Sequence, residues 1–259
     1  MKEVKEKSTD AMAFFDLDGT LLPLPSLEYR LWRELRYRKK IGVRNYLNWL
    51  REAARLLPQG IAQIVNGNKA YLRGIRAEAQ ETLTLPKFFP EAVRRVRWHA
   101  ERGDRIAIVS GTLEPLAQRA TRLLEAELRR SGVVVEIKAI ATQLESEDGI
   151  WTGRIVGEAM FGEAKARAIR RVCAARGIEP EKCFAYGDGM KDAAMLGAVG
   201  MPRAVNPTDD LARVAAQRKW PILRWNNCAR LLHEERGRDG ELIDRGKATN
   251  AEPETGAGT

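Results

Sequence analysis

The 259-residue sequence predicts an α/β fold in which a three-layer, Rossmann-like parallel sheet lies between helices. Short apolar runs alternate with segments of helical periodicity, which is the pattern of a parallel sheet covered by helices. The region between the first two runs departs from this alternation and holds only helical patterns. The predicted strands are 11–16, 105–110, 133–141, 183–187 and 201–205.

The first predicted strand contains the apolar run Ala11–Phe15, and Gly19 and Thr20 form the turn that leaves it. Asp16 and Asp18 therefore stand at the carboxyl end of this strand. Ligands bind at that edge of open parallel sheets, so the two carboxylates are candidates for chemistry. Taken alone, such a pair is more often part of a turn or a helix cap than a catalytic site.

Residues 24–85 are predicted to form a helical subdomain, because a parallel crossover needs one helix and this segment has three or four helical patterns. Since the insertion follows Asp18, we expect it to cover the acidic pair. The residues at helical spacing are Leu27, Leu31, Trp32 and Leu35, then Val43, Tyr46, Leu47, Leu50 and Leu57, then Leu72, Ile75, Ala79 and Leu83.

The remaining segments complete the predicted organisation. Apolar residues at helical spacing between 113 and 128 predict a helix that covers the sheet, and turn signals in 147–155 predict a small hairpin. The polar C-terminal segment is expected to be disordered. The predicted parts are a flexible arm 1–10, a catalytic core 11–23 and 86–228, a helical cap 24–85 and a disordered tail 229–259.

Composition favours a cytoplasmic protein. No apolar run reaches the roughly 18 residues of a membrane span, and the charged N-terminal segment does not resemble a signal peptide. The cysteines, Cys173, Cys183 and Cys228, are odd in number and lack metal-ligand spacing, which fits reduced thiols. The two histidines, His99 and His233, are expected at the surface.

A second acidic pair, Asp188 and Asp192, follows the predicted strand 183–187. If this strand neighbours the first one, the carboxylates converge, and each like-charged pair at about 4 Å costs on the order of 4 kcal/mol at an effective dielectric near 20. Such a cluster needs a cation. Oxygen ligands without histidine or thiolate favour Mg²⁺, which usually also binds a phosphate.

A bound phosphate needs hydrogen-bond donors and a fixed positive charge. Ser110, Gly111 and Thr112 end the predicted strand 105–110 and can supply donors, although they could equally cap the next helix. Lys165 lies in the first turn of a predicted helix, where a lysine opposes the helix dipole by about 0.3–1 kcal/mol. This position hints at another purpose such as phosphate binding, although a lone lysine in a helix is more simply explained as solvated.

Four segments in order resemble the motifs of the haloacid dehalogenase superfamily: Asp16–Thr20, Ser110–Thr112, Lys165 and Gly187–Asp192. The helical insertion resembles the type 1 cap of that superfamily. The stretch from the Asp-Gly-Ile turn to Lys165 is similar to subclass IB, which contains the phosphoserine phosphatases. The resemblance spans roughly residues 11–225. The four motifs together are a specific signal, whereas the second and third alone are weak.

This resemblance implies an Mg²⁺-dependent phosphatase that forms an aspartyl-phosphate. Asp16 would be the nucleophile, Asp18 the general acid and base, and Lys165 would stabilise the transition state. Asp18 also distinguishes phosphatases from the dehalogenases, which lack that second aspartate. The implied metal ligands are Asp16, Asp18, Asp188 and Asp192, and the implied phosphate-binding residues are Thr20, Ser110, Gly111 and Lys165.

Two departures from the phosphoserine phosphatase pattern leave the substrate open. Pro25 stands nine residues after Asp16, where those enzymes place the glutamate that binds the substrate amino group, and Glu28 lies nearby. Lys191 replaces a neutral polar residue and could contact phosphate or solvent. We expect a small phosphorylated metabolite as substrate. A phosphotransferase, a lipid-phosphate phosphatase at a membrane surface and a non-enzymatic phosphate-binding regulator are the alternatives.

The cap holds twelve Lys and Arg residues against five Glu, which is +7 of the formal net charge of +9. A solvated face and an anionic partner explain this excess equally well. Interleaved aromatic residues make an anionic membrane surface a candidate partner, whereas nucleic acid is disfavoured because no binding motif accompanies the charge. A soluble substrate is favoured slightly, because aromatic residues at helical spacing also fit packing over the active site. The oligomeric state is not predicted.

Overall fold

A seven-stranded sheet runs through residues 10–225, the part of the chain that this computed structural model describes. The strand order is β4-β3-β2-β1-β5-β6-β7, and all neighbours pair in parallel except β3 and β4. The strands are β1 (Met12–Phe15), β2 (Arg105–Leu113), β3 (Ile137–Glu147), β4 (Ile150–Val156), β5 (Phe184–Gly187), β6 (Met201–Val205) and β7 (Ile222–Leu223).

The α/β prediction is confirmed, with differences at the ends of some strands. The third strand begins at Ile137 rather than at residue 133 and continues to Glu147, where Asp148 and Gly149 turn the chain into β4. Both turn residues have positive φ, 50° and 73°, as a tight hairpin requires. The two-residue strand β7 was not predicted, because so short a segment has no readable periodicity.

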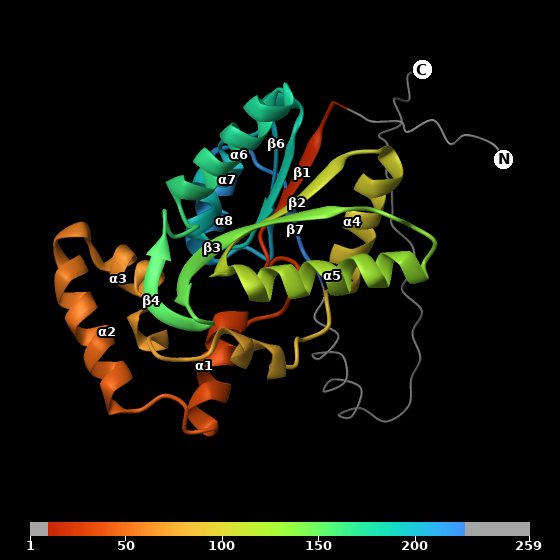
Figure 1. Ribbon diagram of the computed structural model, residues 1–259. Coiled ribbons are helices and arrows are strands. Elements are labelled where there is room, and N and C mark those ends of the chain that lie inside the picture. The colour runs from red at the N-terminus through yellow and green to blue at the C-terminus, as the bar shows by residue number, and fades with distance from the viewer. Residues whose placement is uncertain (1–9, 226–259) are drawn as a thin grey trace, which may run out of the picture. The chain divides into compact units, whose positions relative to one another are not determined.

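Helices cover both faces of the sheet (Figure 1). Side chains alternate along β1, so Ala13 and Phe15 pack on one side and Met12 and Phe14 on the other. The first side faces α4 (Pro90–Arg102) and α5 (Glu114–Arg130). The second side faces α6 (Glu163–Arg176), α7 (Ala193–Leu196) and α8 (Asp209–Gln217).

The helical insertion leaves the sheet after β1 and returns at α4 (Figure 1). It contains α1 (Leu27–Tyr37), α2 (Val43–Leu56) and α3 (Ile61–Gly67), with short 3₁₀ segments at Leu57–Gln59, Ala70–Leu72 and Ala77–Thr82. The boundaries 24 and 85 remain a prediction. The predicted helical pattern from Leu72 to Leu83 is wrong as an α-helix, because Gly74 has φ +83° and Arg76 pairs with Ile150 of β4.

The predicted arm and tail lie largely or wholly outside the described residues, as do Cys228 and His233. Cys173 and Cys183 are buried, free thiols whose sulfur atoms lie 3.9 Å apart. Short 3₁₀ segments also occur at Pro180–Lys182 and Met190–Asp192. No helix within residues 10–225 is long and apolar enough to cross a bilayer.

The surface position predicted for His99 is wrong, because its side chain is completely buried under the sheet. Its Nδ1 donates to the Asp104 carboxylate at 2.7 Å, and its Nε2 accepts from the Tyr186 hydroxyl at 2.8 Å. Phe15 stacks on Tyr186 with ring centroids 4.4 Å apart. This network ties α4 to β1 and β5, the two strands that end in the acidic motifs.

Burial lowers the pKa of His99 from its ordinary value of 6.5 to about 4. Between these values the unfolded chain binds a proton that the folded protein does not, so stability rises with pH in this window. Lowering the pH from 7 to 5 should therefore cost roughly 2 kcal/mol of unfolding free energy through His99 alone. Urea denaturation at the two pH values measures this cost.

Two variants separate the effect of His99 titration on stability from the effect of lost packing and hydrogen bonding. His99→Gln is expected to be less stable at neutral pH but to lack that part of the pH dependence. Tyr186→Phe removes one hydrogen bond and keeps the titrating ring, so it should retain the dependence. An unchanged pH dependence in His99→Gln would contradict the assignment.

Candidate active site

The candidate site lies at the carboxyl ends of β1, β2 and β5. Strand β1 pairs with β5 on one side and with β2 on the other. The strands that precede Asp16 and Asp188 are therefore neighbours, so the two acidic motifs lie side by side. The amide of Asp16 donates to the carbonyl of Tyr186 at 2.8 Å, so the first aspartate is fixed to the neighbouring strand. Asp188 follows two residues later, and Ser110 lies in β2.

Three buried carboxylates, those of Asp16, Asp188 and Asp192, meet at this edge. One oxygen from each lies within 4.8 Å of the others. Among the described residues, Asp16 Oδ2 and Asp188 Oδ1 are buried without a hydrogen-bond partner. Burial, followed by the charges of Asp16 and Asp192, raises the pKa of Asp188 to about 8. The orphaned oxygens and the accumulated negative charge fit a divalent cation that prefers oxygen ligands.

Lys165 supplies the fixed positive charge of the cluster and is completely buried. Its Nζ donates to Asp16 Oδ1 and, at 2.6 Å, to Asp192 Oδ1. Burial alone would lower the pKa of Lys165, but the two carboxylates together outweigh it and the pKa lies above its ordinary value. The ammonium therefore stays charged, as a phosphate-binding role requires.

Two glycines let the acidic residues approach one another. Gly19 has φ +92°, and a Cβ there would lie 2.1 Å from Asp188 Oδ2. A Cβ on Gly187 would lie 2.5 Å from the Cβ of Asp192. Asp192 Oδ2 accepts from the amides of Asp188 and Gly189 at 3.2 Å, so this carboxylate shapes the loop while its other oxygen holds Lys165.

Asp18 joins the core to the cap. Its Oδ1 accepts from the amide of Leu27, the first residue of α1, at 2.8 Å. Burial, followed by the charge of Asp16, raises the pKa of Asp18 to about 6. Thr20 is buried in the same loop, and its hydroxyl has no partner within the described residues.

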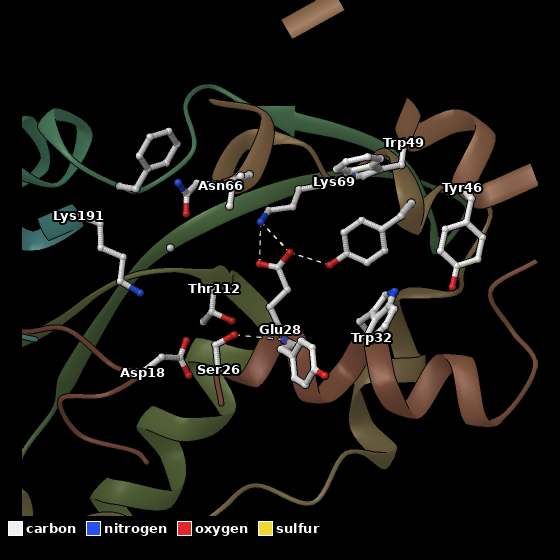
Figure 2. A pocket seen from close by; sticks show the side chains of 15 residues that line it. Asp18, Ser26, Glu28, Trp32, Tyr46, Trp49, Asn66, Lys69, Thr112 and Lys191 are labelled. Atoms are coloured by element: carbon white, nitrogen blue, oxygen red, sulfur yellow. Dashed lines mark hydrogen bonds and ion pairs between the residues drawn. The ribbon is translucent and has the colours of Figure 1, made fainter. Parts of the chain in front are cut away.

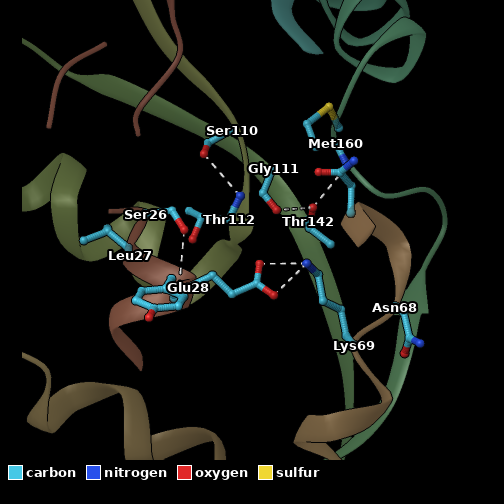
Figure 3. A network of polar contacts seen from close by, with 12 residues as sticks. Ser26, Leu27, Glu28, Asn68, Lys69, Ser110, Gly111, Thr112, Thr142 and Met160 are labelled. Atoms are coloured by element: carbon cyan, nitrogen blue, oxygen red, sulfur yellow. Dashed lines mark hydrogen bonds and ion pairs between the residues drawn. The ribbon is translucent and has the colours of Figure 1, made fainter. Parts of the chain in front are cut away.

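Two hydrogen bonds of Thr142, which the sequence did not predict, hold the segment Ser110–Thr112 in place (Figure 3). The Thr142 hydroxyl donates to the Gly111 carbonyl at 2.9 Å and accepts from the Met160 amide at 3.0 Å. Ser110 Oγ accepts from the Thr112 amide at 3.2 Å. The buried Thr112 hydroxyl has no hydrogen-bond partner within the described residues, so Thr112 is an additional candidate for phosphate binding.

A cavity of about 570 Å³ lies between the acidic edge and the cap. Figure 2 shows Asp18, Thr112 and Lys191 at one end of it and aromatic side chains at the other. The charge of Asp16, the largest influence, raises the pKa of Lys191. Of the two orientations left open by the sequence, Lys191 takes the one that lines the cavity.

A partly buried polar trio, Glu28, Lys69 and Tyr71, lines the cavity, and Figure 2 shows Glu28 and Lys69 in its middle. The Glu28 carboxylate accepts from Lys69 Nζ at 2.7 Å through both oxygens and from the Tyr71 hydroxyl at 2.7 Å. Lys69 is only 3% exposed. No local sequence pattern could predict this trio, because Lys69 and Tyr71 are 41 and 43 residues away from Glu28 in the chain.

Comparison with known families agrees with this geometry. The family model for haloacid dehalogenase-like hydrolases matches residues 13–197. The chain belongs to this hydrolase family. It is a phosphatase of the haloacid dehalogenase superfamily, similar to the phosphoserine phosphatase group of subclass IB.

Two relatives of this haloacid dehalogenase-like chain are named phosphoserine phosphatases, and a solved structure is similar to it as well. A phosphoserine phosphatase of Mycobacterium tuberculosis is 30% identical over 226 residues, which cover 82% of this chain and 70% of the relative. One of Idiomarina loihiensis is 28% identical, covering 81% and 88%. A Bordetella pertussis protein of unknown function has a similar structure, with TM-score 0.59, 26% identity and coverage of 83% and 99%.

The carboxylate cluster predicts strong stabilisation by a divalent cation such as Mg²⁺. At a concentration of 100 times the dissociation constant, a cation that binds only the folded protein stabilises it by about 2.7 kcal/mol. Asp188→Asn should abolish most of this gain, and above pH 8, where the metal-free aspartate is charged, it should also relieve repulsion. Thermal unfolding with and without Mg²⁺ measures both effects.

Asp209→Asn is the matched control, because Asp209 is exposed in the first turn of α8 and lies outside the cluster. It should respond to Mg²⁺ as the wild type does. An equal response in Asp188→Asn would show that the ion binds elsewhere.

Proposed function

We propose that this chain is an Mg²⁺-dependent phosphomonoester hydrolase that acts through an aspartyl-phosphate on a small phosphorylated compound. The observation that carries the proposal is the meeting of Asp16, Asp188, Asp192 and Lys165 at one sheet edge, with Asp18 facing the cavity beside them. A buried site of this composition suits a dianionic ligand only when positive charge is added.

The metal would be held by the carboxylates of Asp16, Asp188 and Asp192 together with the Asp18 backbone carbonyl. When bound there, Mg²⁺ supplies positive charge that offsets the phosphoryl oxygens and the carboxylates. Lys165 and the donors around Gly111 would bind the remaining phosphoryl oxygens.

Catalysis then needs two steps that use this chain's own residues. In the first, an Asp16 oxygen attacks phosphorus, the ester P–O bond breaks, and Asp18 gives its proton to the leaving alcohol oxygen. The raised pKa of Asp18, about 6, keeps part of its population protonated near neutral pH. In the second step, Asp18 takes a proton from water, the water oxygen attacks phosphorus, and Asp16 and phosphate are released. An acceptor alcohol in place of water would make a phosphotransferase.

Phosphoserine is the substrate named for several relatives, and it is the second candidate. Glu28 favours it, because this carboxylate lines the cavity despite the proline at residue 25. Lys69 and Tyr71 already occupy the Glu28 carboxylate, so a substrate ammonium would compete with Lys69. Turnover of phosphoserine beside other phosphate esters tests this candidate.

Asp16→Asn should reduce turnover of a generic aryl phosphate by about 10³-fold or more, because the amide cannot act as the nucleophile. The side-chain volume barely changes, so the circular dichroism spectrum should match that of the wild type. Acid-quenched wild type should carry one phosphoryl group on Asp16 by mass spectrometry. A folded variant that keeps about a tenth of the activity would rule out this role for Asp16.

A further inference from the structure

Helix α2 is turned with its apolar side away from the protein. A surface helix normally directs its apolar stripe toward the core. Here Val43 is 75% exposed, Leu47 46% and Leu50 56%, whereas the buried residues of α2 are Asn45 and Leu56. We name the exposed apolar residues of α2, of the following 3₁₀ segment and of α3 the outer apolar face. It consists of Val43, Tyr46, Leu47, Leu50, Leu57, Ile61 and Val65.

Hydrogen bonds hold α2 in this orientation. The buried Asn45 side chain donates to the carbonyls of Tyr71 and Arg73 at 2.9 Å each and accepts from the Gly42 amide at 3.1 Å. Asn68 donates to the carbonyl of Trp49 at 2.9 Å. Turning the leucines inward would break these hydrogen bonds and deprive the carbonyls of Tyr71, Arg73 and Trp49 of these partners. The outward orientation is therefore built into the cap.

Charge on the cap indicates what covers this face. Arg44 and Arg51 are exposed, and helical spacing places them along one border of the face. The cap as a whole carries +7 of the chain's +9. Helices that lie in the interface of an anionic membrane combine an apolar side with a flank of arginines or lysines. A second copy of the chain would instead bring an equal positive charge against it.

The outer apolar face continues into the catalytic cavity. Tyr46 is 40% exposed and Val65 66%, and both also line the cavity. Further along, the lining includes Trp32 and Trp49, and it ends at the polar side chains beside Asp18 (Figure 2). An elongated substrate would match this cavity, with its apolar part at the aromatic end and its phosphate at the polar end.

We propose that the outer apolar face binds an anionic lipid surface, and that the substrate is a phosphate monoester whose alcohol carries an apolar chain. The substrate half rests on the proposed function, whereas surface binding does not require catalysis. The sequence slightly favours a soluble substrate, because aromatic residues at helical spacing also fit packing over the active site, but periodicity does not show which side of α2 faces the protein.

Co-sedimentation tests the surface. The wild type should bind vesicles of phosphatidylcholine mixed with phosphatidylglycerol at low salt, and bind less at high salt or without phosphatidylglycerol. The double variant Leu47→Glu, Leu50→Glu should bind at least about tenfold more weakly. The control is Leu123→Glu on α5, because Leu123 is 47% exposed, nearly the same as Leu47, and lies outside the cap. This control should bind as the wild type does.

Three binding results would overturn the proposal: no binding of the wild type, equal binding of the double variant, or wild-type dimers that the double variant lacks. The last result, seen by sedimentation velocity, would assign the face to a second copy. Circular dichroism shows that each variant is folded.

Turnover tests the substrate. The wild type should hydrolyse a lysophosphatidate in the mixed vesicles, and the double variant should lose most of this activity while hydrolysing a soluble aryl phosphate normally. If the wild type hydrolyses the aryl phosphate but not the lysophosphatidate, the substrate half is overturned. If it binds vesicles and hydrolyses neither ester, the proposed function is overturned and the surface proposal stands.

Discussion

The mutual repulsion of three buried carboxylates is the constraint on which the rest of this structure depends. At about 4 Å and an effective dielectric near 20, each pair costs on the order of 4 kcal/mol, a large part of the 5–15 kcal/mol that stabilises a typical domain. Lys165 offsets part of this cost by binding Asp16 and Asp192 together. The glycine at 19 lets Asp188 come close, and the oxygens of Asp16 and Asp188 that have no hydrogen-bond partner within residues 10–225 are candidate ligands for a cation.

The sheet beneath this cluster is held by a buried polar network rather than by apolar packing alone. His99 connects Asp104 to Tyr186, and Tyr186 stacks on Phe15. These contacts fix β1 against β5 one residue before Asp16 and two residues before Asp188. A network with all its polar groups satisfied makes one register much more stable than its alternatives. The carboxylates therefore meet at a strand pair that cannot easily slip.

The sequence predicted those parts of the molecule that depend on local pattern. Asp16 and Asp188 each follow a short apolar run, so the sequence predicts both the ends of these strands and the acidic edge of the sheet. Periodicity shows which residues share a face but not what they contact, which is why the buried His99 was misplaced. The Glu28–Lys69 pair and the Arg76–Ile150 bridge join residues far apart in the chain. The catalytic roles inferred from the motifs remain predictions.

The cap shows why a helix's direction of packing must be argued from its polar residues. The apolar stripe of α2 would predict a core-facing side, but the buried Asn45 binds two carbonyls and decides the opposite orientation. The cap is in turn bonded to the chemistry, because the first amide of α1 donates to Asp18. One hydrogen bond therefore links the start of the cap to the proposed proton donor.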